Sequence, residues 1–129
     1  MIYKPASEGG LALPLDIKIY DVGCGSGMLG KLLSERGYCD ILGSDASQNL
    51  LEASKGKGCY IELRHMFNGM GLDKFPADLK DRFDLVAASG VWLEGHIPNA
   101  GIEDCYAALK QGGYFVTAMR SYYFVPGQP

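Results

Sequence analysis

The stretch Tyr20–Gly30, with the sequence YDVGCGSGMLG, places four glycines within eight residues. It directly follows an apolar run that is rich in β-branched residues and ends at Val22. Such a run that stops at glycine is typical of a strand entering a loop. Apolar residues from Met28 to Leu33 then recur at helical spacing. The stretch therefore predicts a strand, a bare glycine loop and a helix, in this order.

The same alternation of strand and helix continues along the chain. The expected strands lie at residues 16–23, 40–45, 59–66, 82–90 and 114–119, and the expected helices at 28–37, 47–58 and 99–113. For the last helix, Asn99 is the expected N-cap, and Gly112 with Gly113 the expected end. A helical turn is an alternative for 59–66, and residues 68–81 predict a loop, with one helical turn as an option. This order indicates an α/β fold, a doubly wound and mostly parallel sheet of five strands with helices on both faces.

Length and composition indicate one globular domain. A chain of 129 residues can bury one core, and 47% hydrophobic with 21% charged residues is ordinary globular usage. We expect residues 1–14 to form a loose arm and 15–129 a single domain. No segment stays apolar over the roughly 18 to 20 residues that a membrane helix needs, and no secretion signal is recognisable. The expected location is cytoplasmic, with no membrane partner.

Charge and cysteine spacing indicate neither a nucleic-acid partner nor a zinc site. The net charge is −3 and the basic residues are spread along the chain, so no nucleic-acid partner is indicated. The four cysteines, Cys24, Cys39, Cys59 and Cys105, lack the CxxC spacing of a zinc site. We therefore expect no metal site, and free thiols that are mostly buried.

Two classes of ligand compete for the glycine loop, which lies where doubly wound folds bind ligands. Gly25, Gly27 and Gly30 fit the GxGxxG dinucleotide pattern of a nicotinamide-dependent oxidoreductase, and Asp45 has the spacing of a ribose-binding acid in either case. Asp21 would repel a pyrophosphate, because two unit charges 4 Å apart interact by about 4 kcal/mol at an effective dielectric constant near 20. It would favour a ligand with an ammonium group and no phosphate, such as S-adenosylmethionine.

Three motifs, DVGCGSG, GSDAS and LKQGGYF, in this order and spacing resemble the class I S-adenosylmethionine-dependent methyltransferases. The similarity spans about residues 17–120. The segment GVWLEGHIP, after the fourth strand, is similar to the methyltransferase-like proteins of the Williams-Beuren chromosomal region. The resemblance implies a methyltransferase that uses S-adenosylmethionine as its cofactor.

The resemblance also implies roles for individual residues. The glycine loop would lie under the methionine moiety, Asp21 near its ammonium group, Asp45 on the ribose hydroxyls and Ala46 beside the adenine. Phe67 and Ser89 hold positions where this fold adds adenine and methionine contacts. The implied cofactor-binding residues are Asp21, Gly23, Cys24, Gly25, Gly27, Asp45, Ala46, Phe67 and Ser89.

The chain departs from the family pattern at both ends. Members carry lid helices before the first strand, whereas only residues 1–16 precede it here. Members also add two strands after the fifth, for which the tail after Arg120 is too short. We therefore expect a fragment or a shortened form, whose fifth strand is an exposed edge that could pair with another chain. A non-catalytic module that binds the cofactor or pairs through this edge is a further alternative.

Methyl transfer is an in-line displacement that depends mainly on alignment, worth roughly 7 to 11 kcal/mol. No fixed catalytic side chain is therefore required. For an acceptor that must lose a proton, the loop after the fourth strand offers His96 and Glu94 as candidate bases, with a loop-stabilising donor and a solvated charge as the alternatives. Trp92 suits an acceptor pocket or the core equally, and His65 is expected to be structural. The expected acceptor is a small molecule, which the sequence does not identify.

Overall fold

The computed structural model describes residues 13–89, 98 and 100–118. They form a five-stranded sheet in the order β3-β2-β1-β4-β5, in which every neighbouring pair is parallel. The strands are β1 (Ile19–Val22), β2 (Ile41–Asp45), β3 (Glu62–His65), β4 (Phe83–Ser89) and β5 (Leu109–Ala118). The helices are α1 (Met28–Glu35), α2 (Gln48–Lys57) and α3 (Gly101–Ala108). The predicted doubly wound α/β fold is confirmed.

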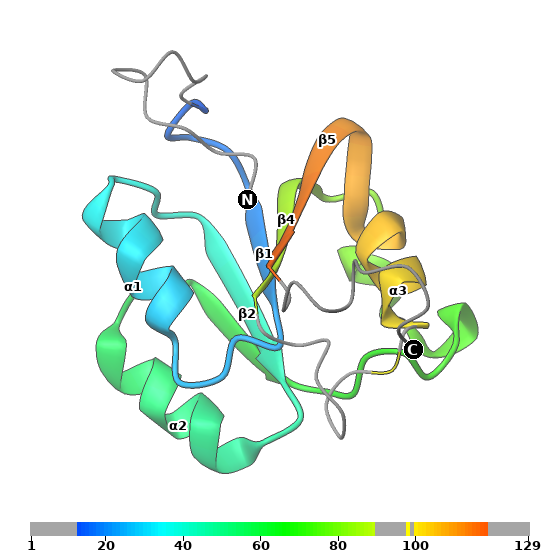
Figure 1. The fold of residues 1–129 in the computed structure, drawn as a ribbon, viewed down its shortest axis with the longest axis horizontal. Coiled ribbons are helices and arrows are strands. Elements are labelled where there is room, and N and C mark those ends of the chain that lie inside the picture. Colours follow the sequence, from blue (N-terminus) through cyan, green and yellow to red (C-terminus); the bar gives the residue numbers. More distant parts are fainter. Residues whose placement is uncertain (1–12, 90–97, 99, 119–129) are drawn as a thin grey trace, which may run out of the picture.

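Helices cover both faces of the sheet, with α1 and α2 on one face and α3 on the other (Figure 1). Successive side chains of a strand point to opposite faces, and β1 shows this clearly. Ile19 packs in the cluster that includes Leu33 of α1. Tyr20 and Val22 pack in the cluster that includes Ala108 of α3. The central strand is therefore buried on both sides, as a parallel sheet requires.

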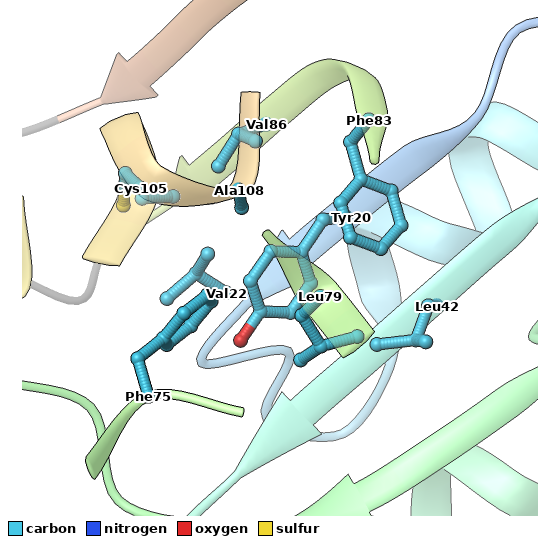
Figure 2. Packing of buried hydrophobic residues seen from close by; sticks show 10 residues of the cluster. Tyr20, Val22, Leu42, Phe75, Leu79, Phe83, Val86, Cys105 and Ala108 are labelled. Atoms are coloured by element: carbon cyan, nitrogen blue, oxygen red, sulfur yellow. The ribbon is translucent and has the colours of Figure 1, made fainter. Parts of the chain in front are cut away.

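The larger core cluster lies between the sheet and α3 (Figure 2). In it, the rings of Tyr20 and Phe83 stack with their centroids 5.1 Å apart. Phe75 and Leu79 reach the same cluster from the segment between β3 and β4. This segment forms two short 3₁₀ turns, η2 (Leu72–Lys74) and η3 (Ala77–Leu79), where the sequence suggested a loop with one turn. Burying each such side chain stabilises the fold by about 1.5 to 3 kcal/mol. The cluster thereby fixes this segment and α3 on the sheet.

The predicted ends of α2 are confirmed. The side chain of Ser47 accepts a 3.3 Å hydrogen bond from the N–H of Leu50, as an N-cap does. Gly58 follows the last helical residue with φ +65°, the left-handed conformation typical of a helix C-terminus. Within the described parts of the chain, none of the helices combines the length and the apolar character needed to cross a membrane.

The end of α3 differs from the prediction. The helix ends at Ala108 and β5 begins at Leu109, so Gly112 and Gly113 lie within a strand. Gly112 has φ +82°, and a Cβ on Gly113 would lie 3.0 Å from two carbonyl oxygens. The glycines therefore permit the irregular register between β4 and β5 instead of ending the helix. Asn99, the predicted N-cap, lies outside the described residues.

The strand order reverses at β1, which pairs with β2 on one side and β4 on the other. In open α/β sheets, ligands bind outside the carboxyl ends of the strands at such a reversal. The loop Gly23–Gly27 leaves the carboxyl end of β1 at this point. The fold therefore places the glycine loop where a ligand site is expected.

Candidate functional site

The loop Gly23–Gly27 leads from β1 into α1 with glycines in the left-handed region. The φ angle is +57° at Gly25 and +91° at Gly27, values that residues with a Cβ rarely adopt. A 3.0 Å hydrogen bond from the N–H of Gly27 to the carbonyl oxygen of Cys24 closes the turn. A second bond of 2.8 Å, from the N–H of Cys24 to the carbonyl oxygen of Ser44, ties the loop to β2. The backbone geometry accounts for the glycine pattern.

The two sides of the loop differ in what surrounds them. A Cβ on Gly25 would have no described protein atom within 4 Å. A Cβ on Gly27 would lie 3.0 Å from Oγ of Ser54, on α2. One side of the loop therefore packs against α2, while the main chain at Gly25 borders open space that a ligand can enter.

Helix α2 holds the loop through two carbonyl groups. The hydroxyl group of Ser54 donates a 2.6 Å hydrogen bond to the carbonyl oxygen of Gly25. The ammonium group of Lys57 donates a 2.6 Å hydrogen bond to the carbonyl oxygen of Ser26. Because both donors come from one helix, the loop is fixed before any ligand binds.

Asp45, the last residue of β2, bonds to backbone on both sides of the site. Its Oδ2 accepts a 2.9 Å hydrogen bond from the N–H of Gly25, and its Oδ1 accepts a 2.8 Å bond from the N–H of Ser47. An ionised carboxylate can accept about four hydrogen bonds, so each oxygen retains a lone pair. Asp45 is only partly buried. It therefore positions the loop and can still accept hydroxyl groups from a ligand.

Asp21 lies differently from the expectation. It is 1% exposed on the sheet face that α1 and α2 cover, and its Oδ2 accepts a 2.6 Å hydrogen bond from the hydroxyl group of Tyr60. Burial raises the pKa of Asp21 to about 7. The hydrogen bond from Tyr60 lowers this pKa, and the charge of Asp45 raises it further. The sequence argument assumed a fully ionised carboxylate facing the ligand, so its repulsion of a pyrophosphate was overestimated. An interaction with an ammonium group stays a prediction.

The rim of the site contains the residues expected around an adenine. Nε2 of His65, at the end of β3, donates a 2.8 Å hydrogen bond to the carbonyl oxygen of Ala46, which agrees with a structural role. The ring of Phe67 is 64% exposed, and its centroid lies 6.1 Å from that of His65. Ser89 is exposed at the carboxyl end of β4. Ala46 and Phe67 therefore lie at the same edge of the sheet as Asp45.

The candidate catalytic residues fall in a segment that is not described. Glu94, His96 and Trp92 all lie within residues 90–97, outside the described part of the chain. Their roles as base or pocket wall stay predictions. The described site thus includes the residues predicted to bind the cofactor, but not those predicted to act in catalysis.

Comparison with known proteins assigns the chain to a family. Residues 19–113 match a family model described as a methyltransferase domain. The chain belongs to this methyltransferase domain family. The match includes the glycine loop and Asp45, and it decides against the dinucleotide oxidoreductase that the GxGxxG pattern also allowed.

The matches to individual relatives cover most of this chain but less than half of each relative. The ubiquinone biosynthesis O-methyltransferase of Coxiella burnetii is 27% identical over 106 residues, which are 81% of this chain and 44% of that protein. Human methyltransferase-like protein 27 is 28% identical over 108 residues, which are 84% of this chain and 42% of that protein. The crystal structure of an S-adenosylmethionine dependent methyltransferase from Mesorhizobium loti has a TM-score of 0.61 and 28% identity, covering 81% of this chain and 48% of that one. The chain spans less than half the length of these relatives.

Tyr60 is a part of the methyltransferase domain site that the sequence did not reveal. Its ring lies in a slot between α1 and β2, where a Cβ on Gly30 would overlap the ring and a Cβ on Gly43 would lie 2.8 Å from it. Burial raises the pKa of Tyr60, which keeps its hydroxyl group protonated and able to donate to Asp21. The available signal was the pair of glycines, but Gly30 was interpreted as part of a ligand pattern.

A buried polar network on the α3 face was also missed. The hydroxyl group of Tyr20 lies 2.8 Å from Oγ of Ser44, and burial raises the pKa of Tyr20 to about 12. The amide of Asn68 donates to Oη of Tyr20 at 3.4 Å and to Oδ2 of Asp104 at 3.2 Å. The N–H of Gly69 donates to the same Asp104 oxygen at 2.8 Å. The network links the loop after β3 to α3, through residues that share no sequence motif.

Cys24 is the cysteine of the glycine loop, and its predicted contact with the cofactor stays a prediction. Cys24 is buried in the glycine loop, and burial raises the pKa of its thiol to about 12, so it is a poor nucleophile. All four thiols are free, but only Cys24 and Cys105 are buried, while Cys59 is partly buried and Cys39 is exposed. Across the described ranges, no group of three or more His, Cys, Asp or Glu side chains could hold a metal ion.

Proposed function

We propose that this methyltransferase domain binds S-adenosylmethionine at the loop Gly23–Gly27 and transfers its methyl group to a small-molecule acceptor. The observation that carries the proposal is the open side of Gly25 directly beside Asp45. A main chain without a Cβ lets a ligand approach closely, and the carboxylate retains acceptor capacity for neighbouring hydroxyl groups. Membership of the family and the position at the strand reversal support the same reading.

The residues present suit the chemical groups of this cofactor. Asp45 can accept hydrogen bonds from ribose hydroxyls while it holds the loop. Phe67 offers an exposed apolar ring for the flat adenine, and Ala46 leaves room beside it. The cofactor, when bound, supplies an electrophilic methyl group on a sulfonium sulfur. The loop would contribute by alignment, because it is already fixed by Ser54 and Lys57.

The acceptor side of the proposal depends on residues beyond the described site. A hydroxyl-bearing acceptor is the first class to test, because the Coxiella burnetii relative is named an O-methyltransferase. Such an acceptor must lose a proton, and His96 or Glu94 is the proposed base. The closer relationship to the methyltransferase-like proteins of the Williams-Beuren chromosomal region is supported by GVWLEGHIP and by 28% identity with human methyltransferase-like protein 27.

We also propose that the domain pairs with another chain through β5 and that it is located in the cytoplasm. Strand β5 pairs with β4 and is the last strand in the order of the described sheet, which supports pairing of its outer edge with another chain. A cytoplasmic location agrees with the composition. Sedimentation of the full chain at increasing concentration tests the pairing, and a monomer at every concentration would exclude self-association through β5.

Isothermal titration of the full chain with S-adenosylhomocysteine and with NADH tests the cofactor. We expect heat with S-adenosylhomocysteine and none with NADH, and the reverse result would exclude the proposal. Turnover is then measured with S-adenosylmethionine and a panel of small hydroxylated acceptors. Binding without turnover of any acceptor would favour the alternative of a non-catalytic module.

A further inference from the structure

We propose that Tyr60 is a positioning residue for the cofactor: the hydrogen bond from its hydroxyl group stabilises the negative charge of Asp21 beneath the loop Gly23–Gly27, and this charge favours a ligand with an ammonium group. The inference rests on the proposed function and names the residue that controls the charge of the same site. Tyr60 acts through Asp21 and needs no contact with the ligand.

The geometry holds the Tyr60 ring in one place. The ring fills the slot left by Gly30 on α1 and Gly43 on β2, where a side chain on either glycine would collide with it. From this slot the hydroxyl group reaches Oδ2 of Asp21 at 2.6 Å. Tyr60 lies 39 residues from Asp21 in the chain, so the contact exists only in the folded domain.

The surroundings of Asp21 make this hydrogen bond important. A carboxyl group that is 1% exposed loses the stabilisation of its charge by water, and donors to the charged form restore part of it. Asp45 of β2 adds a repelling charge, and the neutral thiol of Cys24 lies in the loop above.

Among the described residues, the other elements around Asp21 bring no further charge next to it. The ammonium group of Lys57, from α2, bonds to a loop carbonyl. On the sheet itself, Asp21 is flanked by a glycine of β2 and an alanine of β4, which add no charge. The α1 residue at this slot is likewise a glycine.

The charge of Asp21 should therefore act on ligand binding through pH. Burial raises the pKa of Asp21 to about 7, so the group is only partly ionised at neutral pH. Replacing the Tyr60 hydroxyl group by hydrogen removes the effect that lowers this pKa, and the ionised fraction at pH 7 falls. A ligand with an ammonium group loses affinity as a result, and regains it at higher pH.

The experiment compares two ligands that share adenosine and a thioether. S-Adenosylhomocysteine carries the ammonium group, and 5′-methylthioadenosine lacks the amino acid end. Their affinities for the wild-type chain and for Tyr60→Phe are measured by titration calorimetry between about pH 5.5 and 8.5, where an exposed ammonium stays mostly charged. Tyr60→Phe keeps the ring in its slot and removes only the donor.

We expect the wild-type affinity for S-adenosylhomocysteine to fall as the pH falls below about 7. Tyr60→Phe should bind this ligand about five- to fiftyfold more weakly at pH 7, with its midpoint at higher pH, because a lost hydrogen bond to a charged group raises the pKa by about 1 to 2 units. Binding of 5′-methylthioadenosine should be the same for both proteins. Any effect of the exposed His65 on adenosine binding should appear with both ligands, so it can be distinguished from the effect of Asp21 on the ammonium group.

Asp21→Asn provides a second variant, which keeps an acceptor for the Tyr60 hydroxyl group and cannot be charged. This variant should bind S-adenosylhomocysteine weakly at every pH and should bind 5′-methylthioadenosine like the wild type. It therefore tests the inference even if Tyr60→Phe does not fold. If the variants keep the wild-type pH profile, or lose the same affinity for both ligands, the inference about Tyr60 is wrong, while the proposed function still stands. A wild-type chain that binds neither ligand would overturn the proposed function as well.

Discussion

The backbone N–H of Gly25 donates a 2.9 Å hydrogen bond to Oδ2 of Asp45. Gly25 follows β1, and Asp45 is the last residue of the adjacent strand β2. The second oxygen of the same carboxylate accepts the N–H of Ser47 at the start of α2. One side chain thus joins the glycine loop, the end of β2 and the helix that supports the loop. Asp45 therefore organises the site as well as offering acceptors to a ligand, and its replacement should affect both roles.

Asp45→Asn keeps the size of the side chain but removes its charge and one acceptor oxygen. We expect the affinity for S-adenosylhomocysteine to fall about ten- to hundredfold, because hydrogen bonds to charged groups contribute about 1.5 to 3 kcal/mol and 1.4 kcal/mol is tenfold. Titration calorimetry measures the loss. Glu35→Gln makes the same charge change on an exposed residue of α1 and should leave the affinity unchanged. Equal losses in the two variants would contradict a local role for Asp45.

Gly25→Ala and Gly58→Ala form a matched pair. Both glycines have positive φ, +57° and +65°, and a Cβ on either meets no described atom within 4 Å. Each variant should lose about 1 to 2 kcal/mol of stability from backbone strain, measured by urea unfolding. Only Gly25→Ala should lose cofactor affinity, because its new methyl group projects into the proposed site. If both variants bind S-adenosylhomocysteine equally well, the open side of Gly25 is not the cofactor site.

Local sequence signals predicted most of the fold. Ser47 and Gly58 mark the ends of α2 because a cap and a left-handed glycine act within a few residues of the chain. The apolar spacing that indicated α3 was less informative about packing. Ile102 and Tyr106 are 37% and 64% exposed, whereas the face against the sheet includes the acidic Asp104. A buried aspartate needs partners from distant segments, which no periodicity reveals.

The sequence likewise predicted only part of the candidate site. Gly25 and Asp45 could be placed because a glycine loop after a strand and an acid after the next strand have a fixed relation in this fold. The surroundings of Asp21 could not be placed, because they depend on Tyr60, whose position follows from packing against Gly30. Sequence spacing identified the residues at the strand ends. The charge state of those residues required the tertiary structure.

Asp21 should make the stability of the domain fall as the pH rises. Its pKa is about 7 in the folded chain and 3.8 without the fold, so the folded state binds the proton more tightly. The stabilisation is fully present below about pH 4 and is lost as the pH rises to about 7, on the order of 4 kcal/mol in total. Asp21→Asn lacks this dependence. Urea unfolding of both proteins from pH 4 to 8 should show the wild type losing stability relative to the variant, and parallel curves would contradict the buried, protonated carboxyl group.

Asp104→Ala tests the buried network that joins the loop after β3 to α3. The substitution leaves the N–H of Gly69 and the amide of Asn68 without their shared acceptor. Each buried donor without a partner costs about 1 to 3 kcal/mol, so urea unfolding should show a loss of about 2 to 6 kcal/mol for the two donors. Asp104→Asn retains an acceptor oxygen and should lose less than about 1 kcal/mol.

Glu103→Ala is the control for this network, because Glu103 is the exposed neighbour on the same turn of α3. It removes the same charge and should change stability by no more than about 0.5 kcal/mol, as surface substitutions do. A large loss for both alanine variants would indicate a general effect of charge on α3. A loss confined to Asp104→Ala, and largely restored in Asp104→Asn, would show that the acceptor oxygen itself holds the loop on the helix.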